Sequence, residues 1–324
     1  MNVLYLTGFE SSNAALLVEE NRVRLFTDFR YVERAQELEA VEVVETRRYL
    51  YSDLPEELPA RVAFEADAVT YANYESLRDG GVELIARRGL VESLRATKEP
   101  EELDAIRRAT EVTNRAYERF AEEPFAGRTE KELVWVMHQL FHECGADELA
   151  FEIDIAAGPT AATPHALPGE RVVEEGDFVL VDAGVKLDSY CSDCTRTFAV
   201  SEVSSALREL YEVVLRAQQA GVDAVRAGVA GRDADAAARA VIADAGYGGN
   251  FGHGLGHGIG LLVHEAPALR PESGEVLAPG NVVTVEPGIY LSGVAGVRIE
   301  DLVLVTDEGC EVLTSFPKEL TVVT

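Results

Sequence analysis

Two apolar segments of the chain each contain an acidic residue near their end, and this feature restricts the possible folds more than any other. The segments read GDFVLVDAG at 176–184 and GNVVTVEPG at 280–288, and they align without a gap, so that Asp182 corresponds to Glu286. A carboxylate buried in a strand is unfavourable unless it is paired with a cation or binds a metal. We interpret the segments as equivalent strands of a duplicated half-domain. The alternative is a chance likeness between two valine-rich strands.

A second acid follows each of these strands across an expected turn. A turn centred on 187–188 predicts a hairpin in which Asp182 directly faces Asp193, with roughly 5 Å between the Cβ atoms. Glycine and serine mark a second turn region in PGIYLSGVAGVRI, and Glu286 and Glu300 stand on either side of it. The repeat predicts that this second pair reaches the same site as the first.

Four convergent carboxylates would carry about four negative charges, which two divalent cations would neutralise. Facing carboxylates repel each other when no cation lies between them. Salt bridges to Arg196 or Arg298 are the alternative, but they would explain one or two of the acids and not four. The pattern therefore predicts a site for two divalent ions.

The segment FGHGLGHGIGLLVHEAP at 251–267 groups three histidines with five glycines. Its glycines do not satisfy G-x-G-x-x-G, and Ala268 stands where a helical zinc-peptidase motif needs its second histidine, so neither motif is present. An extended segment with one bare glycine face, open to a substrate backbone, is expected instead. In that conformation His253 and His257 lie roughly 13 Å apart, too far to bind one ion. The segment is expected to supply one ligand, while a hydrogen-bonded structural role is the alternative for each histidine.

The order of expected elements predicts two domains with a boundary near residue 95. Strands at 3–9 and 14–28, a short helix at 31–40 and a helix near 73–89 form a small α/β unit. Lys98-Glu99-Pro100 then signals the start of a long helix. Beyond it, helices are expected at 129–144, 202–227 and 232–246, between strands that are mostly joined as hairpins. This alternation is typical of an α+β domain with an antiparallel sheet.

Composition excludes several classes of partner. The net charge of −28, with only four lysines, argues against nucleic acid as a partner. No segment approaches the length of a membrane span, and the first residues do not read as a signal peptide. Four scattered cysteines fit a reducing compartment, so we expect a cytoplasmic protein. An acidic, lysine-poor surface also favours a halophilic setting, in which salt screens the repulsion.

Five residues in this order resemble the metal-ligand set of the pita-bread metallopeptidases, which include methionine aminopeptidase, aminopeptidase P and prolidase: Asp182, Asp193, His257, Glu286 and Glu300. The flanking segments VDAG, SDCTRT, GHGIGLLVHEAP, VEPGIY and GVRIEDLVLVT match as well. YLTGF, LFTDFRY and LRATKEPEELDAIRRA look like the amino-terminal domain and connecting helix of the Xaa-Pro peptidase and creatinase branch.

The resemblance implies an α+β chain with two domains. Residues 1–95 would form a small α/β domain like the creatinase amino-terminal domain, and residues 96–324 a pseudo-two-fold pita-bread catalytic domain. The first expected strand begins almost at Met1, so either the start codon is misassigned or the amino-terminal domain is abbreviated. A homodimer is expected by the same resemblance.

The resemblance also assigns roles to the site residues. Asp182 would bind one ion, His257 and Glu286 the other, and Asp193 and Glu300 would bridge them. A bridging hydroxide would attack the peptide carbonyl, with Glu286 as the proton shuttle. One imidazole and four carboxylates suit manganese better than zinc, with cobalt and iron as further candidates.

Five further residues resemble groups that handle substrate or orient ligands. His264 would stabilise the tetrahedral intermediate or contact the scissile amide, and His165 would line the substrate pocket. His253 would lie near the leaving group, while Tyr290 and Arg298 would orient the ligands. Packing and ion pairing are the alternatives for these residues.

The expected activity is hydrolysis of Xaa-Pro bonds in proline-containing peptides, as an aminopeptidase or a dipeptidase. The alternatives are a metal-free peptide-binding module of the same fold and a creatinase-type amidinohydrolase. Relatives of those kinds generally lose ligands, whereas this chain keeps all five.

Overall fold

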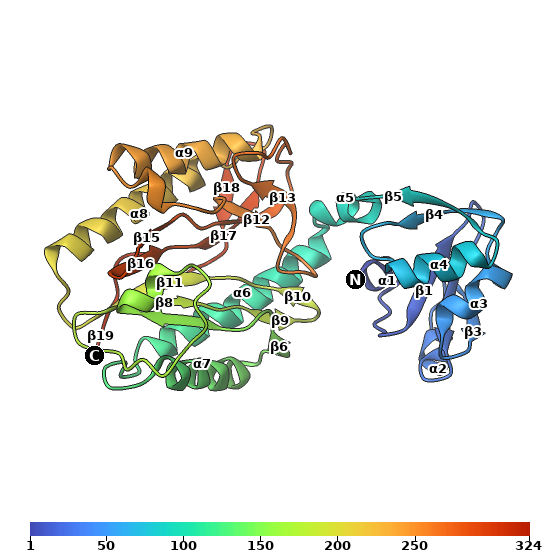
Figure 1. Cartoon of the computed structure of the whole chain (residues 1–324), viewed down its shortest axis with the longest axis horizontal. Coiled ribbons are helices and arrows are strands. Elements are labelled where there is room, and N and C mark those ends of the chain that lie inside the picture. The colour runs from blue at the N-terminus through green and yellow to red at the C-terminus, as the bar shows by residue number, and fades with distance from the viewer. The chain divides into compact units, whose positions relative to one another are not determined.

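A computed structural model describes residues 1–324, and the chain divides into two compact units, Met1–Arg95 and Ala96–Thr324. Figure 1 colours the first unit from blue to cyan and the second from blue-green to red. Each unit has its own buried apolar clusters. No helix is long and apolar enough to cross a membrane.

The amino-terminal unit is a small α/β structure. In chain order its elements are α1 (Asn2–Thr7), β1 (Ala14–Val18), β2 (Val23–Asp28), α2 (Val32–Ala35), β3 (Glu42–Thr46), α3 (Leu50–Glu57), β4 (Arg61–Glu65), α4 (Tyr71–Asp79), β5 (Glu83–Arg87) and α5 (Leu90–Ala96). The strands form a three-stranded sheet, β1-β2-β3, and a parallel pair, β4-β5. The hairpin predicted over 14–28 is present as β1 and β2.

Two elements predicted for this unit are wrong. Residues 2–7 form helix α1 instead of a strand, and Gly8 ends that helix at φ 69°, donating its N–H to Leu4 O. The helix predicted near 73–89 stops at Asp79, and strand β5 follows it. Gly80 and Gly81 break the helix there, since Gly81 adopts φ 90°, a conformation that most side chains avoid.

The carboxy-terminal unit contains long helices and antiparallel sheets. Its helices are α6 (Pro100–Phe120), α7 (Glu130–Cys144), α8 (Ser205–Ala224) and α9 (Gly231–Asp244), with short 3₁₀ turns η1 (Gly158–Ala162) and η2 (Gly248–Asn250). Its strands are β6 (Glu148–Leu149), β7 (Asp154–Ala157), β8 (Phe178–Asp182), β9 (Val185–Leu187), β10 (Tyr190–Cys191), β11 (Thr195–Val200), β12 (Gly256–Gly258), β13 (Glu265–Leu269), β14 (Val282–Val285), β15 (Gly288–Leu291), β16 (Ala295–Arg298), β17 (Asp301–Val305), β18 (Cys310–Val312) and β19 (Val322–Val323).

Two sheets form the centre of this unit, and each packs against its own pair of helices. The sheet β19-β11-β8-β7 shares one buried cluster with α6 and α7, as Phe120, Met137 and Phe198 show. The sheet β13-β12-β14-β17-β18 shares another with α8 and α9, which includes Val214, Ala238 and Val285. In Figure 1 the two helix pairs lie on opposite sides of the strands. The predicted α+β fold with duplicated halves is therefore present.

The register of the first hairpin differs from the prediction. Asp182 pairs with Thr195, and Leu187 pairs with Tyr190, so Asp182 and Asp193 do not face each other directly. The turn lies at Asp188 and Ser189, with φ values of 48° and 71°, instead of at 187–188. Two successive residues with positive φ form the tight turn that matches strand twist. The residue opposite Asp182 is therefore 195 instead of 193. Because this shift is two residues, Asp182 and Asp193 stay on one face of the sheet as diagonal neighbours.

Candidate metal centre

Side chains from both halves of the carboxy-terminal unit meet at one buried cluster. Asp193, His257 and Glu300 each offer a ligand atom, and these three atoms lie within 4.8 Å of one another. His257 Nε2 lies 3.8 Å from Asp193 Oδ2 and 3.3 Å from Glu286 Oε1. Asp182 is the fifth member of the cluster. It pairs with Thr195 in the β8–β11 ladder, and this register places it on the same face as Asp193, two residues away. The structure therefore brings together all five residues predicted as metal ligands.

Strand ends supply the four acids. Asp182 is the last residue of β8, and Asp193 lies between β10 and β11. Glu286 directly follows β14, and Glu300 lies between β16 and β17. Because each acid lies at or next to the end of a strand, its side chain can reach a centre that several strands share. The aligned positions of the two repeats thus arrive at the same site.

Three buried carboxylate oxygens of the cluster have no hydrogen-bond partner: Asp182 Oδ1, Asp193 Oδ1 and Glu300 Oε1. An unpaired buried carboxylate oxygen is strongly unfavourable, and most such atoms have a partner in native proteins. Burial, followed by the neighbouring carboxylates, raises the pKa of Asp193 and Glu300 well above the usual range. Burial also raises the pKa of Glu286. The donor set fits hard divalent cations, which would supply the missing partner and favour the ionised acids.

His257 is oriented to present Nε2 to the acids. Its Nδ1 lies 3.1 Å from Gly258 O, which can only accept, so Nδ1 carries the proton. The Nε2 lone pair then faces Asp193 and Glu286. Burial lowers the pKa of His257 and favours the neutral imidazole that binds metals.

Arg298 links the acids of the two halves. Its Nη2 donates to Asp182 Oδ2 at 2.5 Å, and its Nε donates to Thr195 Oγ1 at 3.0 Å. Thr195 Oγ1 in turn donates to Glu300 Oε2 at 2.8 Å. Arg298 Nη1 also donates to the hydroxyl of Tyr290 at 2.9 Å. Asp182 is the one acid of the four that pairs with an arginine, as the salt-bridge alternative allowed.

The other predicted histidines surround the cluster at different depths. His253 Nε2 lies 2.9 Å from the Tyr290 hydroxyl, and burial lowers the pKa of His253. The His264 ring is exposed, with its centroid 4.2 Å from that of His257. His165 is 91% exposed, and its Nδ1 lies 3.9 Å from Asp154 Oδ2.

Four of the five glycines on the face predicted to be open to substrate pack instead against the protein itself, so the prediction is wrong for all but Gly252. A Cβ atom at Gly256 would lie 2.0 Å from Thr284 O, and one at Gly258 would lie 2.2 Å from Ala266 O. The segment is also not extended throughout, because within it only residues 256–258 (β12) and 265–267 (the start of β13) form strands, and β12 pairs with β13 and β14. These glycines allow three strands to approach closely around His257.

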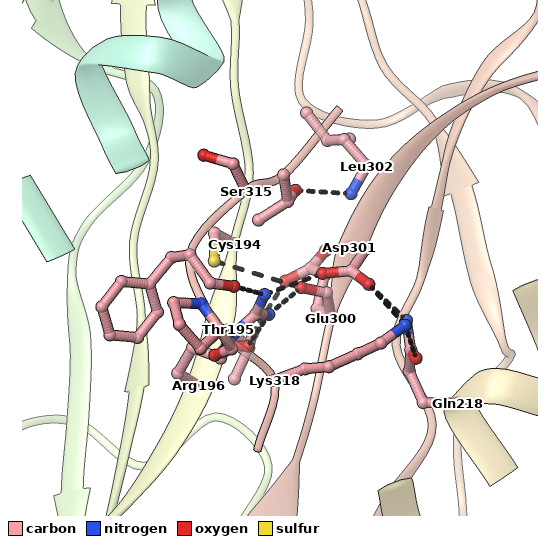
Figure 2. Close-up of polar contacts among 12 residues, drawn as sticks. Cys194, Thr195, Arg196, Gln218, Glu300, Asp301, Leu302, Ser315 and Lys318 are labelled. Carbon is pink, nitrogen blue, oxygen red and sulfur yellow. Dashed lines mark hydrogen bonds and ion pairs between the residues drawn. The ribbon is translucent and has the colours of Figure 1, made fainter. Parts of the chain in front are cut away.

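A buried polar network behind Glu300 was not anticipated. Figure 2 shows Arg196, which donates to Asp301 Oδ1 at 2.8 Å and to the backbone oxygen of Glu300. Gln218 Nε2 and Lys318 Nζ lie 2.8 Å and 3.4 Å from Asp301 Oδ2. The signal was present in IEDLVLVT, where Asp301 is a second acid at the start of an apolar run. The network holds the backbone of Glu300 against α8 and the carboxy-terminal segment.

Family models match most of the chain. Residues 104–307 match the metallopeptidase family M24, and residues 1–97 match the creatinase/prolidase amino-terminal domain. The uncharacterized peptidase YqhT of Bacillus subtilis is 36% identical over 326 residues, covering 98% of this chain and 92% of that protein.

Solved structures resemble both units of the chain. The Xaa-Pro dipeptidase from Bacillus anthracis is 40% identical with a TM-score of 0.95, covering 99% of this chain and 92% of that one. The X-Pro aminopeptidase from Thermotoga maritima is 35% identical with a TM-score of 0.91, covering 99% and 93%. The prolidase from Pyrococcus furiosus is 34% identical with a TM-score of 0.92, covering 97% and 94%.

Proposed function

Because the chain belongs to metallopeptidase family M24, we propose that it hydrolyses Xaa-Pro bonds at the amino terminus of peptides, with two divalent metal ions. The observation that carries this proposal is the set of three unpartnered, buried carboxylate oxygens beside His257 Nε2. Similar structures include an Xaa-Pro dipeptidase, an X-Pro aminopeptidase and a prolidase, which favours proline-directed substrates.

The five clustered residues would hold the ions, with Asp182 on one ion and with His257 and Glu286 on the other. Asp193 and Glu300 would lie between them. When bound, divalent ions polarise a substrate carbonyl and lower the pKa of water. On the donor set of four carboxylates and one imidazole, we propose manganese as the native metal, before cobalt, iron or zinc.

The side chains around the cluster would handle protons and orient the substrate. Glu286 would move the proton from the attacking water to the leaving proline nitrogen, with Thr284 Oγ1 donating to its Oε1 at 3.0 Å. His264 would contact the scissile amide, and His253 would lie on the leaving-group side. His165 would line the substrate pocket, while Tyr290 and Arg298 would orient the ligands.

A product assay tests the proposal and separates its two forms. Protein purified without chelators is analysed for metal and is then given Leu-Pro and a pentapeptide that begins Leu-Pro, with and without added Mn²⁺. Cleavage of the dipeptide alone supports a dipeptidase, and release of leucine from both supports an aminopeptidase. Absent metal together with no Mn²⁺-dependent cleavage would contradict the peptidase and favour a metal-free binding module. Urea release from creatine would favour a creatinase-type enzyme.

The composition supports two further parts of the proposal, and the family resemblance supports a third. Four free cysteines favour a reducing compartment, and we place the enzyme in the cytoplasm. The net charge of −28 favours a high-salt setting, so unfolding in urea should require more denaturant as KCl rises. An equal urea midpoint in dilute buffer and at high KCl would contradict the high-salt setting. A homodimer, proposed from the family resemblance, is tested by sedimentation equilibrium.

A further inference from the structure

Asp154 places a fifth carboxylate beside the acid cluster. It begins β7, which lies at the edge of its sheet, and it pairs directly with Asp182 across the β7–β8 ladder. Residues that pair in this way carry their side chains on the same face, with about 5 Å between Cβ atoms. Ile153 and Ile155 on either side are buried, whereas the Asp154 side chain keeps 20% of its surface exposed. The carboxylate therefore lies on the face of the sheet that carries Asp182.

The fold itself gives this carboxylate little compensation. Its one ion-pair partner is His165 Nδ1 at 3.9 Å, beyond hydrogen-bond distance, on a ring that is 91% exposed. Arg298 is the arginine of the cluster, and its donors go to Asp182, Thr195, Tyr290 and the Pro164 carbonyl. A partly buried carboxylate without a hydrogen bond is unfavourable, so a position of this kind suggests a role in recognition.

Two divalent ions would neutralise the four acids of the cluster but would leave Asp154 uncompensated. A cation brought by the substrate would pair with it. The α-ammonium group is common to all peptides with a free amino terminus and is next to the scissile bond. Lysine and arginine side chains carry their charge on a long stem, which can extend from the cluster toward the sheet edge.

We propose that Asp154 is a specificity-determining residue that favours substrates with lysine or arginine before proline. The inference rests on the proposed Xaa-Pro peptidase function. It concerns recognition of the first residue and leaves the hydrolytic step unchanged.

Lysyl-proline and norleucyl-proline provide a matched pair of substrates, because norleucine has the lysine stem without the ammonium group. We expect the Mn²⁺-loaded wild type to show the higher kcat/KM for lysyl-proline. Asp154→Asn should lower the ratio of the two kcat/KM values roughly five- to tenfold, mainly through KM for lysyl-proline, as for a partly desolvated charge pair. Norleucyl-proline hydrolysis should change little.

Glu152→Gln is the control, because it removes one negative charge from an exposed residue just before β7. Glu152→Gln should leave the ratio of the two kcat/KM values close to that of wild type. Asp154→Glu should give a ratio between those of wild type and Asp154→Asn. A ratio that is the same in wild type and Asp154→Asn would overturn the inference, while cleavage of both substrates would still support the peptidase. An equal loss on both substrates would overturn it in favour of α-ammonium binding. A wild type inactive on both dipeptides and on longer Xaa-Pro peptides would remove the proposed function itself.

Discussion

The two halves of the carboxy-terminal unit deliver two acids each, but they do so with different registers. In the first half the tight turn at 188–189 places Asp182 opposite Thr195, and Asp193 lies two residues nearer the turn. In the second half Val285 pairs with Asp301, so the next pair along this register is Glu286 and Glu300. The acids are therefore diagonal neighbours in one half and directly opposed in the other.

This difference gives the halves different chemical surroundings. The offset in the first half leaves Thr195 opposite Asp182, where its hydroxyl accepts from Arg298 and donates to Glu300. In the second half Glu286 lies next to His257 and pairs with no arginine. The first half thus holds an acid with a fixed counter-charge, and the second holds the acid best placed to exchange protons.

The largest expected effect tests this difference in roles. Glu286→Gln removes the proposed proton shuttle but keeps an oxygen donor, and it should lower kcat on Leu-Pro by roughly 10²–10⁴-fold. Thermal unfolding should remain close to that of wild type. Glu272→Gln, at an exposed glutamate of the same half, serves as the control. Near-wild-type turnover by Glu286→Gln would remove the distinction between the halves.

Metal removal should destabilise both halves in a pH-dependent way. The raised pKa values of Asp193 and Glu300 mean that the folded apoprotein binds protons more tightly than the unfolded chain. The contribution of these two acids to stability should be fully present below about pH 4, their unfolded pKa, and should be lost as pH rises. Each loss of about 1 kcal/mol lowers Tm by roughly 2–4 °C.

Melting curves with EDTA between pH 5 and pH 8 measure this effect. Added Mn²⁺ should remove most of the pH dependence, because it stabilises the ionised acids. An apoprotein that becomes more stable as pH rises would contradict the buried, unpaired state of these carboxylates.

The aligned glycines of the repeat should respond differently to alanine. A Cβ atom at Gly184 would lie 2.1 Å from Ser192 O, a backbone atom, whereas one at Gly288 would lie 2.6 Å from the Tyr290 hydroxyl. Gly184→Ala should therefore reduce the free energy of unfolding by about 1–3 kcal/mol. Gly288→Ala should lose less stability and more activity, because Tyr290 must leave Arg298 and His253.

Urea unfolding and Leu-Pro hydrolysis measure the two effects separately. Gly252→Ala is the matched control, since no atom lies within 4 Å of its added Cβ. Equal losses of stability at 184 and 288 would show that the two halves pack alike at this position.

The smallest expected effect concerns the turn that sets the first register. Ser189 has φ 71°, which glycine adopts without strain. Ser189→Gly should raise the free energy of unfolding by about 0.5 kcal/mol, measured by urea unfolding. A loss of stability would indicate that the turn is not the positive-φ turn at 188–189 that makes Asp182 and Asp193 diagonal neighbours.

The sequence was sufficient to predict the elements that depend on local patterns. The start of α6 follows from Lys98-Glu99-Pro100, and at that helix start the Glu99 N–H donates to Glu102 Oε2 at 3.0 Å. The repeat predicted that Asp182 and Glu286 reach one site, because acids in apolar strands need compensation. The metal-ligand set followed from these acids and the resemblance together.

Other features depend on tertiary contacts that local patterns do not specify. Residues 3–9 are apolar enough for a strand, but residues 2–7 form helix α1, which ends at Gly8 in the left-handed region. The turn at 188–189 could not be separated from one at 187–188, because both place a polar residue at the turn. The sequence did not indicate a role for Asp154, because its position beside the cluster depends on its pairing with Asp182 on another strand.

The two-residue turn between β9 and β10 has an evolutionary consequence. Adding or removing one residue there would rotate Asp193 to the opposite face of the sheet and would destroy the site in a single step. Changes of two residues would only slide Asp193 along the same face. Insertions and deletions in this hairpin should therefore be tolerated in even numbers, and a library of loop-length variants would show survival that alternates with length.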